Sequence, residues 1–349
     1  MFATPVRPSQ RRRSRRTALT ATATAALALA LLAGNGPVSY GATAASAVAA
    51  CDQPDPALTV SVPAGGDIQS AVDEVADAGG GCVDLAAGTW TLAQSLQMRT
   101  GVALNGSGTA TLLQGPSAVY DYPLITLTGP EPRSGVIVEN MKLDGRIPAS
   151  ALTTDPDADN PYSGALGIYF AAFTYDDQDI LVKNVEIANT AMGIHIKGAE
   201  GVTLDSDYLH ENGIAYWLHN SYLRRVTDVL ITHCRMDGSL IGTGLHVAGT
   251  SSGITIEDSE FNGNAAHGVN IQDQPQDVAL SGDTFDDNDG DGIRATGDNL
   301  VIDGNTTLGN SADGIHTLTG TGSVTHNTSS GNGGLQLDIH GSFTVSDNN

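Results

Sequence analysis

The sequence predicts an all-β, single-domain solenoid in which short parallel strands are wound into successive coils. Three observations predict it: the composition, a recurring glycine, and the alternation of apolar residues between the glycines. Aromatic residues make up 5% of the chain and charged residues 16%, and 42 of the 349 residues are glycine. From residue 167 onward, a glycine followed by Ile, Leu or Val recurs every 20 to 31 residues, and the intervening runs alternate in strand fashion. The repeated glycines are Gly167, Gly193, Gly213, Gly244, Gly268, Gly292, Gly314 and Gly334.

Residues 1–50 are predicted to be an export signal that is removed. They contain a basic start, an apolar stretch too short to span a bilayer, and then small residues before Cys51. The run from Ser14 to Leu19 is similar to a twin-arginine signal, although Ala18 stands where a bulky residue is usual. The mature protein is therefore expected to be secreted, with no membrane partner after the signal is removed.

The charge balance excludes one class of partner. All six cations of the first fifty residues lie in the predicted signal, so residues 51–349 carry 10 cations against 39 acids, a formal charge of -29. A nucleic-acid partner would require a basic face to meet its phosphates, and we expect none. The sequence leaves the oligomeric state open.

The next element, residues 51–90, is predicted to form an N-terminal cap, followed by coils over residues 91–349. Ile68, Val72 and Val75 have helical spacing, which predicts one short helix. Export permits a disulfide, and Cys51 and Cys82 are placed where they could fasten the N-terminus. The remaining Cys234 is interpreted as a small buried residue of the core.

Within each coil, two apolar positions seven residues apart are predicted to stack on their equivalents in neighbouring coils. Ile254 with Phe261 and Val278 with Phe285 are examples. An asparagine follows three residues later in several coils, and amides in register can bond from one coil to the next. The predicted ladder consists of Asn212, Asn264, Asn288 and Asn310.

This pattern resembles the right-handed parallel β-helix of the pectate-lyase-like superfamily, from roughly Val60 to the C-terminus. The resemblance implies that the short helix caps the open N-terminal end of the coil. It also implies a carbohydrate-active enzyme, and lyases, hydrolases, epimerases and transferases all occur on this fold. The fold alone does not choose among them.

Alternation from each repeated glycine predicts two outward columns on one sheet, which gather basic and aromatic side chains on an acidic protein. The first column is predicted to contain Tyr169, His195, Ala215, His246, Asn270, Arg294, His316 and Gln336. The second is predicted to contain Ala171, Lys197, Trp217, Ala248, Gln272, Thr296, Leu318 and Asp338. A groove of this kind suits a linear polymer, and Trp217, next to Lys197 in the predicted register, could stack on a sugar ring.

The leading functional hypothesis is a secreted lyase that cleaves an acidic, uronic-acid-containing polysaccharide of the pectate or alginate type by β-elimination. Such a reaction needs a cation to neutralise the substrate carboxylate, a base and a proton donor. The candidate catalytic residues are Arg225 and Arg294 as neutralising groups, Lys197 or His195 as the base, and His246 as a donor, a role also open to Tyr169. The candidate substrate-binding residues are Tyr169, Trp217, His219, Arg224, Asn270 and His316.

Three alternatives remain open. A glycoside hydrolase or a glycosyl (fructosyl) transferase would need two carboxyl groups across the scissile bond, and acids are scarce in the predicted columns. A uronan epimerase would share the first proton abstraction, and a non-catalytic polysaccharide-binding solenoid needs no chemistry. No cofactor is required by a motif, but Asp289 and Asp291 lie in an acidic turn that could bind calcium.

Overall fold

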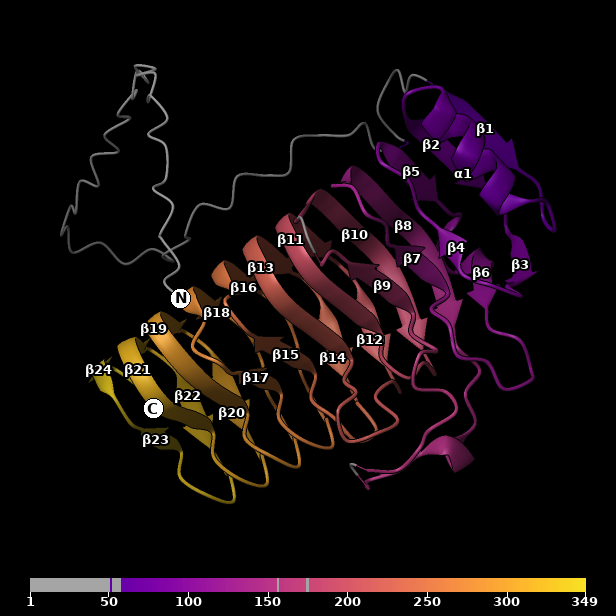
Figure 1. Ribbon diagram of the computed structural model, residues 1–349. Helices are drawn as coiled ribbons and strands as arrows, with labels where there is room; N and C mark the ends of the chain where they lie inside the picture. Colours follow the sequence, from indigo (N-terminus) through magenta and orange to yellow (C-terminus); the bar gives the residue numbers. More distant parts are fainter. Residues whose placement is uncertain (1–50, 52–57, 156, 174–175) are drawn as a thin grey trace, which may run out of the picture. The chain divides into compact units, whose positions relative to one another are not determined.

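The computed structural model describes Cys51 and residues 58–155, 157–173 and 176–349, which form a solenoid of parallel strands with one α-helix (Figure 1). The predicted export signal lies outside the described residues. In the first part, the strands are β1 (Thr59–Val62), β2 (Gly81–Leu85), β3 (Gly88–Thr91), β4 (Leu96–Gln97), β5 (Val102–Asn105), β6 (Thr111–Gln114), β7 (Ile125–Leu127), β8 (Ser134–Asp144), β9 (Ile168–Ala171), β10 (Asp177–Ala188), β11 (Ile194–Asp205) and β12 (Tyr208–His210). They continue with β13 (Ser221–Thr232), β14 (Arg235–Asp237), β15 (Leu245–Ala248), β16 (Ser252–Glu257), β17 (Val269–Ile271), β18 (Gln276–Ser281), β19 (Ile293–Asp303), β20 (Thr306–Leu308), β21 (Ile315–Thr325), β22 (Thr328–Ser330), β23 (Leu337–Ile339) and β24 (Ser342–Ser346). No helix among the described residues is long and apolar enough to cross a membrane.

The predicted helix is α1 (Ile68–Asp77), at the N-terminal end of the strands (Figure 1). Asp67 caps it by accepting a hydrogen bond from the Ser70 N–H at 3.1 Å. Its apolar face, which includes Val72 and Val75, packs into the core, so the helical spacing is confirmed. Its role as a cap stays a prediction.

The predicted disulfide is also confirmed, since Cys51 and Cys82 are bonded with their Cα atoms 5.3 Å apart. Cys234 is free and buried, as expected of a core residue. Burial raises the pKa of its thiol well above the usual range, so it is not poised as a nucleophile.

The interior is filled by stacked apolar side chains in register. Val229, Ile254 and Val278 are register partners in adjacent coils, and all three are fully buried. The rings of Phe261 and Phe285 lie parallel with centroids 5.2 Å apart. The predicted seven-residue pairing of apolar positions is therefore confirmed, because each coil buries its members on those of the next.

The asparagine ladder is confirmed, and Asn332 extends it. Each asparagine of the ladder accepts a backbone N–H of the preceding coil at its side-chain oxygen, as Asn288 Oδ1 does from Asn264 at 2.9 Å. One rung lacks an amide, because Ser239 stands there. Asn220 fills that gap, since its side chain accepts from Asn212 Nδ2 at 3.1 Å and donates to Asn264 Oδ1 at 3.3 Å.

A second buried ladder was not predicted from the sequence. It uses four residue types, so no single letter recurs through all of it; its members are Asp207, Cys234, Ser259, Asp283, Asn305, Asn327 and, half-buried at the end, Asn348. Burial raises the pKa of Asp207 and of Asp283 well above the usual range for a carboxyl group. Each also has one carboxyl oxygen with no hydrogen-bond partner among the described residues. Burial therefore favours the neutral form of these two acids, in positions where other coils use an amide.

Candidate active site

The outward columns exist, but the structure corrects their membership. In the predicted alignment, Gly213 begins a strand, whereas Ile194 N–H donates to Asn220 O and the strand that follows is β13. Residues 213–220 therefore form the connection before the strand, and Asn220 takes the place of the repeated glycine. The observed first column is Tyr169, His195, Tyr222, His246, Asn270, Arg294, His316 and Asp338. The second begins with Ala171, Lys197, Arg224 and Ala248.

The predicted register was wrong in two places, the strand expected after Gly213 and the last repeat. Tyr222 and Arg224 occupy the positions that were assigned to Ala215 and Trp217, so Lys197 neighbours Arg224. Trp217 is 66% exposed on the connection, where its ring packs edge-on against Tyr216. At the C-terminal end, Asp338 rather than Gln336 is the register partner of His316, because the last repeat is offset by two residues.

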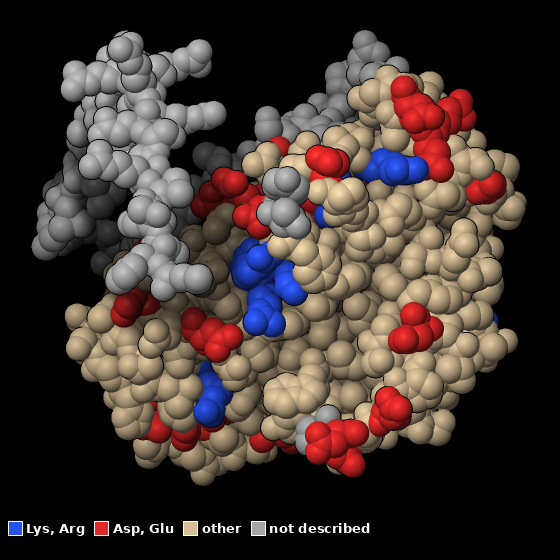
Figure 2. Space-filling view, in the orientation of Figure 1, with Lys and Arg blue, Asp and Glu red and all other residues tan. Residues whose placement is uncertain are grey.

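The cations form a group at the middle of the solenoid. Lys197 and Arg224 are register partners on β11 and β13, and Arg225 follows directly. Figure 2 shows a compact group of Lys and Arg side chains on the face that it displays. Arg225 is anchored, since its Nη2 donates to Ala172 O at 2.8 Å. A side chain at Gly198 would meet that guanidinium at 2.5 Å, so glycine leaves room for the cation.

Lys197 is the member of this group whose protonation is most open to change. Its Nζ lies 4.4 Å from the centroid of the Phe173 ring. Burial lowers the pKa of Lys197, and the neighbouring charges of Arg224 and Arg225 lower it further. Proximity of like charges makes the ammonium a better proton donor and its conjugate amine more accessible near neutral pH.

His195 lies in the first column between two tyrosines. Its ring centroid is 5.2 Å from that of Tyr169 and 4.9 Å from that of Tyr222. Burial, assisted by the charges of Lys197 and Arg224, lowers the pKa of His195 to about 4. The imidazole is therefore neutral at pH 7. Burial also raises the pKa of Tyr169, whose phenol stays protonated.

His246 is oriented by a second histidine behind it. Thr243 N–H donates to His219 Nδ1 at 3.1 Å, so neutral His219 carries its proton on Nε2. That proton points at His246 Nδ1, 3.1 Å away, which leaves the proton of neutral His246 on its own Nε2. Burial lowers the pKa of His246 to about 4 and that of His219 well below the usual range. His219 is 7% exposed, so it positions His246 rather than lining the surface.

The remaining predicted residues extend the column toward the C-terminus. Asn270 is buried, and Arg294 pairs with Asp291 at 3.3 Å. Four coils separate Arg294 from His195, about 19 Å at about 4.8 Å per coil, so the two cannot act on one sugar unit. Asp289 is exposed and does not join Asp291, which is buried and faces His316. Asp291 instead has ligand atoms of Asp313 and His316 within 4.8 Å, and calcium binding by Asp289 and Asp291 stays a prediction.

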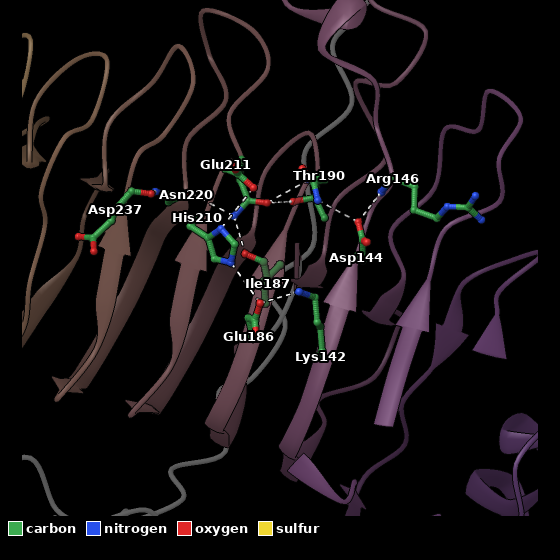
Figure 3. Close-up of polar contacts among 12 residues, drawn as sticks. Lys142, Asp144, Arg146, Glu186, Ile187, Thr190, His210, Glu211, Asn220 and Asp237 are labelled. Atoms are coloured by element: carbon green, nitrogen blue, oxygen red, sulfur yellow. Dashed lines mark hydrogen bonds and ion pairs between the residues drawn. The ribbon is translucent and has the colours of Figure 1, made fainter. Parts of the chain in front are cut away.

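A separate polar cluster lies on β8, β10 and β12 (Figure 3). Glu186 Oε1 is 2.6 Å from Lys142 Nζ and 3.2 Å from His210 Nε2. Burial raises the pKa of Glu186, but the hydrogen bonds from Lys142 and His210 outweigh it and hold that pKa below its usual value. Lys142 and Glu186 therefore form an ion pair across neighbouring strands, and His210 adds a hydrogen bond from the next strand.

Comparison with known proteins identifies a family whose fold matches this solenoid. The family described as the right handed beta helix region matches residues 162–277 and 222–349, together more than half of the chain. No curated protein matches the chain at a significant level.

Several solved structures share the fold. The A-module of the Azotobacter vinelandii mannuronan C-5 epimerase AlgE4 has a TM-score of 0.56 at 20% identity, covering 80% of this chain and 89% of that one. The alginate lyase of Paenibacillus sp. str. FPU-7 has a TM-score of 0.55 at 14% identity, covering 83% and 99%. The Streptococcus pneumoniae surface protein and adhesin PfbA has a TM-score of 0.62 at 14% identity, covering 84% and 95%. At these identities the similarity concerns the fold, which is an all-β right-handed β-solenoid with one short helix. The chain belongs to the family of proteins with a right-handed β-helix region.

Proposed function

We propose that this protein is a secreted enzyme that cleaves a uronic-acid-containing polysaccharide by β-elimination, at the middle coils of the two outward columns. One observation carries the proposal: Lys197 and Arg224 are register partners in the second column, next to Tyr222 and the neutral histidines of the first column. An anionic sugar can be held there next to a base and a hydroxyl group. The disulfide between Cys51 and Cys82 suits the oxidising compartment that export implies.

In the proposed step, the guanidinium of Arg224 pairs with the substrate carboxylate and makes the adjacent ring proton more acidic. Lys197, as the free amine, removes that proton. The electron pair forms a carbon–carbon double bond while the bond to the glycosidic oxygen breaks. The Tyr222 hydroxyl donates a proton to the leaving oxygen, so charge and atoms balance.

The proton affinities favour Lys197 over His195 as the base. An efficient base has a pKa near the working pH. The pKa of His195 is about 4, which makes its imidazole a weak base at neutral pH. The pKa of Lys197 is lowered from a high starting value, so it moves toward the useful range. His195 then serves as a neutral contact that excludes water between the two tyrosines.

A glycoside hydrolase is the runner-up. It requires two carboxyl groups about 5 to 9.5 Å apart that can reach the substrate. Among the described residues the first column contains one acid, Asp338, at its C-terminal end. Asp291, which pairs with Arg294, is buried, and one of its oxygens accepts the Asp313 N–H at 3.0 Å. Asp291 is therefore committed to structure, and the scarcity of acids in the column disfavours hydrolysis.

The proposal is tested with polymannuronate, polyguluronate and pectate, each with and without added calcium. A lyase produces unsaturated ends that absorb in the ultraviolet, and a hydrolase produces reducing ends without that absorbance. An epimerase changes the uronate composition without shortening the polymer, and a binding protein retains the polymer unchanged. Loss of absorbance in Lys197→Ala, with the ultraviolet product present in wild type, supports the assignment; wild-type activity in that variant contradicts it.

A further inference from the structure

We propose that the last two coils contain a binding site for a zinc-class transition-metal ion, formed by His316, Asp338 and His340. One ligand atom from each of these side chains lies within 4.8 Å of the others. His316 on β21 and Asp338 on β23 are register partners, and His340 follows β23 directly. The site is independent of the proposed lyase chemistry, which lies several coils away.

The spacing of the ligand atoms suits a tetrahedral ion. His340 Nε2 is 3.0 Å from Asp338 Oδ1, and His316 Nε2 is 3.6 Å from Asp338 Oδ2. Zinc bonds of about 2.0 to 2.2 Å place tetrahedral ligand atoms about 3.4 Å apart. The side chain of His340 is 61% exposed and can rotate to close the remaining distance to His316.

A buried carboxylate orients His316. Asp291 Oδ2 is 3.3 Å from His316 Nδ1, and the Asp291 side chain is only 3% exposed. Asp291 is itself held, since its Oδ1 accepts the Asp313 N–H at 3.0 Å. A carboxylate that accepts the Nδ1 proton leaves the lone pair of Nε2 directed at Asp338 and His340. Metal-binding histidines commonly have this kind of outer partner.

The donor set selects the class of ion. Two imidazoles and one carboxylate suit zinc and related first-row metals, whereas calcium takes six to eight oxygen ligands. Three protein ligands leave one position for water. A bound ion would also join β23 to β21, and β23 is the last strand of this sheet face among the described residues. Metal binding should therefore stabilise the C-terminal coil through mass action.

The test uses untagged, metal-free protein titrated with Zn²⁺ and assayed for bound metal after equilibrium dialysis. Wild type should bind one ion per chain. Asp338→Asn and His340→Ala should each lower the affinity at least tenfold. Asp291→Asn should lower it about 10- to 100-fold while keeping the stoichiometry, as expected of an outer partner. His326→Ala is the matched control, because His326 is an exposed histidine beside Asp303 and should leave binding unchanged.

Thermal melting distinguishes a variant that has lost zinc binding from one that has lost stability. In EDTA, His340→Ala should melt at the wild-type temperature, because the side chain it removes is exposed. Added Zn²⁺ should raise the melting temperature of wild type and His326→Ala but not of His340→Ala. Equal zinc affinity in wild type, Asp338→Asn and His340→Ala would overturn the proposal. Less than one ion per wild-type chain at saturation, or an equal loss in His326→Ala, would overturn it as well.

Discussion

Removing one buried amide from the asparagine ladder should lower the free energy of unfolding of the solenoid, although the substitution leaves its surface unchanged. Asn288 is fully buried and takes part in four side-chain hydrogen bonds. Its Nδ2 donates to Phe261 O at 3.0 Å and to Asn310 Oδ1 at 2.9 Å, and its Oδ1 accepts from the backbone N–H and the Nδ2 of Asn264.

The size of the loss in the free energy of unfolding depends on which polar groups have no hydrogen-bond partner left in Asn288→Ala. Asn310 Oδ1 still accepts the N–H of residue 288, and Asn264 Nδ2 still donates to Met236 O. The Asn264 N–H and the Phe261 carbonyl lose the side-chain partners that the ladder provides. Each buried backbone group left unsatisfied costs about 1 to 3 kcal/mol, so we expect a loss of about 2 to 6 kcal/mol in the free energy of unfolding.

Urea denaturation followed by far-ultraviolet circular dichroism measures this loss. Asn105→Ala is the matched control, because the Asn105 side chain bonds only to the side chains of Asp84 and Asn140 and is half-buried. Water can replace those bonds, so the control should lose less than about 1 kcal/mol. A loss in Asn288→Ala no larger than that of Asn105→Ala would refute the ladder's role in stability.

Three further predictions concern buried charge and pH. Asp283→Asn should stabilise the protein by more than about 1 kcal/mol at pH 7, because each unit by which burial raises the pKa of a carboxyl group costs about 1.4 kcal/mol. The folded-state pKa of Asp283 is raised, so wild type loses stability as pH rises above the unfolded pKa of about 3.9, and the gain should vanish in denaturation measured near pH 3. Asp177→Ala should cost about 3 to 5 kcal/mol, because it leaves the buried guanidinium of Arg133 without the carboxylate at 2.7 Å; a melting temperature equal to that of wild type would contradict this. Arg224→Gln should raise the pKa of Lys197, so the rising limb of kcat against pH should move to higher pH; an unmoved limb would show that Lys197 is not the titrating base.

The sequence predicted the parts of the fold that depend on composition and spacing. Inward apolar residues repeat because every coil must fill the same interior, and the amides of Asn264 and Asn288 recur because adjacent turns bond to each other. The helix was also predictable from local spacing, and the disulfide from the expected export and the places of Cys51 and Cys82. The second ladder was missed because Cys234 and Asp283 perform with different side chains what asparagine performs elsewhere.

The candidate site was predicted in part, because register depends on where a strand begins. Gly213 with the following Ile214 matched the repeat by letter, but Asn220 makes the corresponding turn in space. That shift replaced Trp217 with Arg224 beside Lys197. The buried asparagine, which fills the rung left by Ser239, was the available signal, but its meaning depends on contacts between coils.

The central claim is that Lys197, beside Arg224, abstracts a proton from a bound uronate. The most direct measurement is the rate of ultraviolet-absorbing product from acidic polysaccharide, compared between wild type, Lys197→Ala and the control His233→Ala, whose side chain is 62% exposed. We predict that wild type and His233→Ala are active and that the rate of product formation in Lys197→Ala is at least about 100-fold lower. General base catalysis usually contributes at least about 10²-fold to the rate. Unsaturated product formed by Lys197→Ala at the wild-type rate would contradict the account.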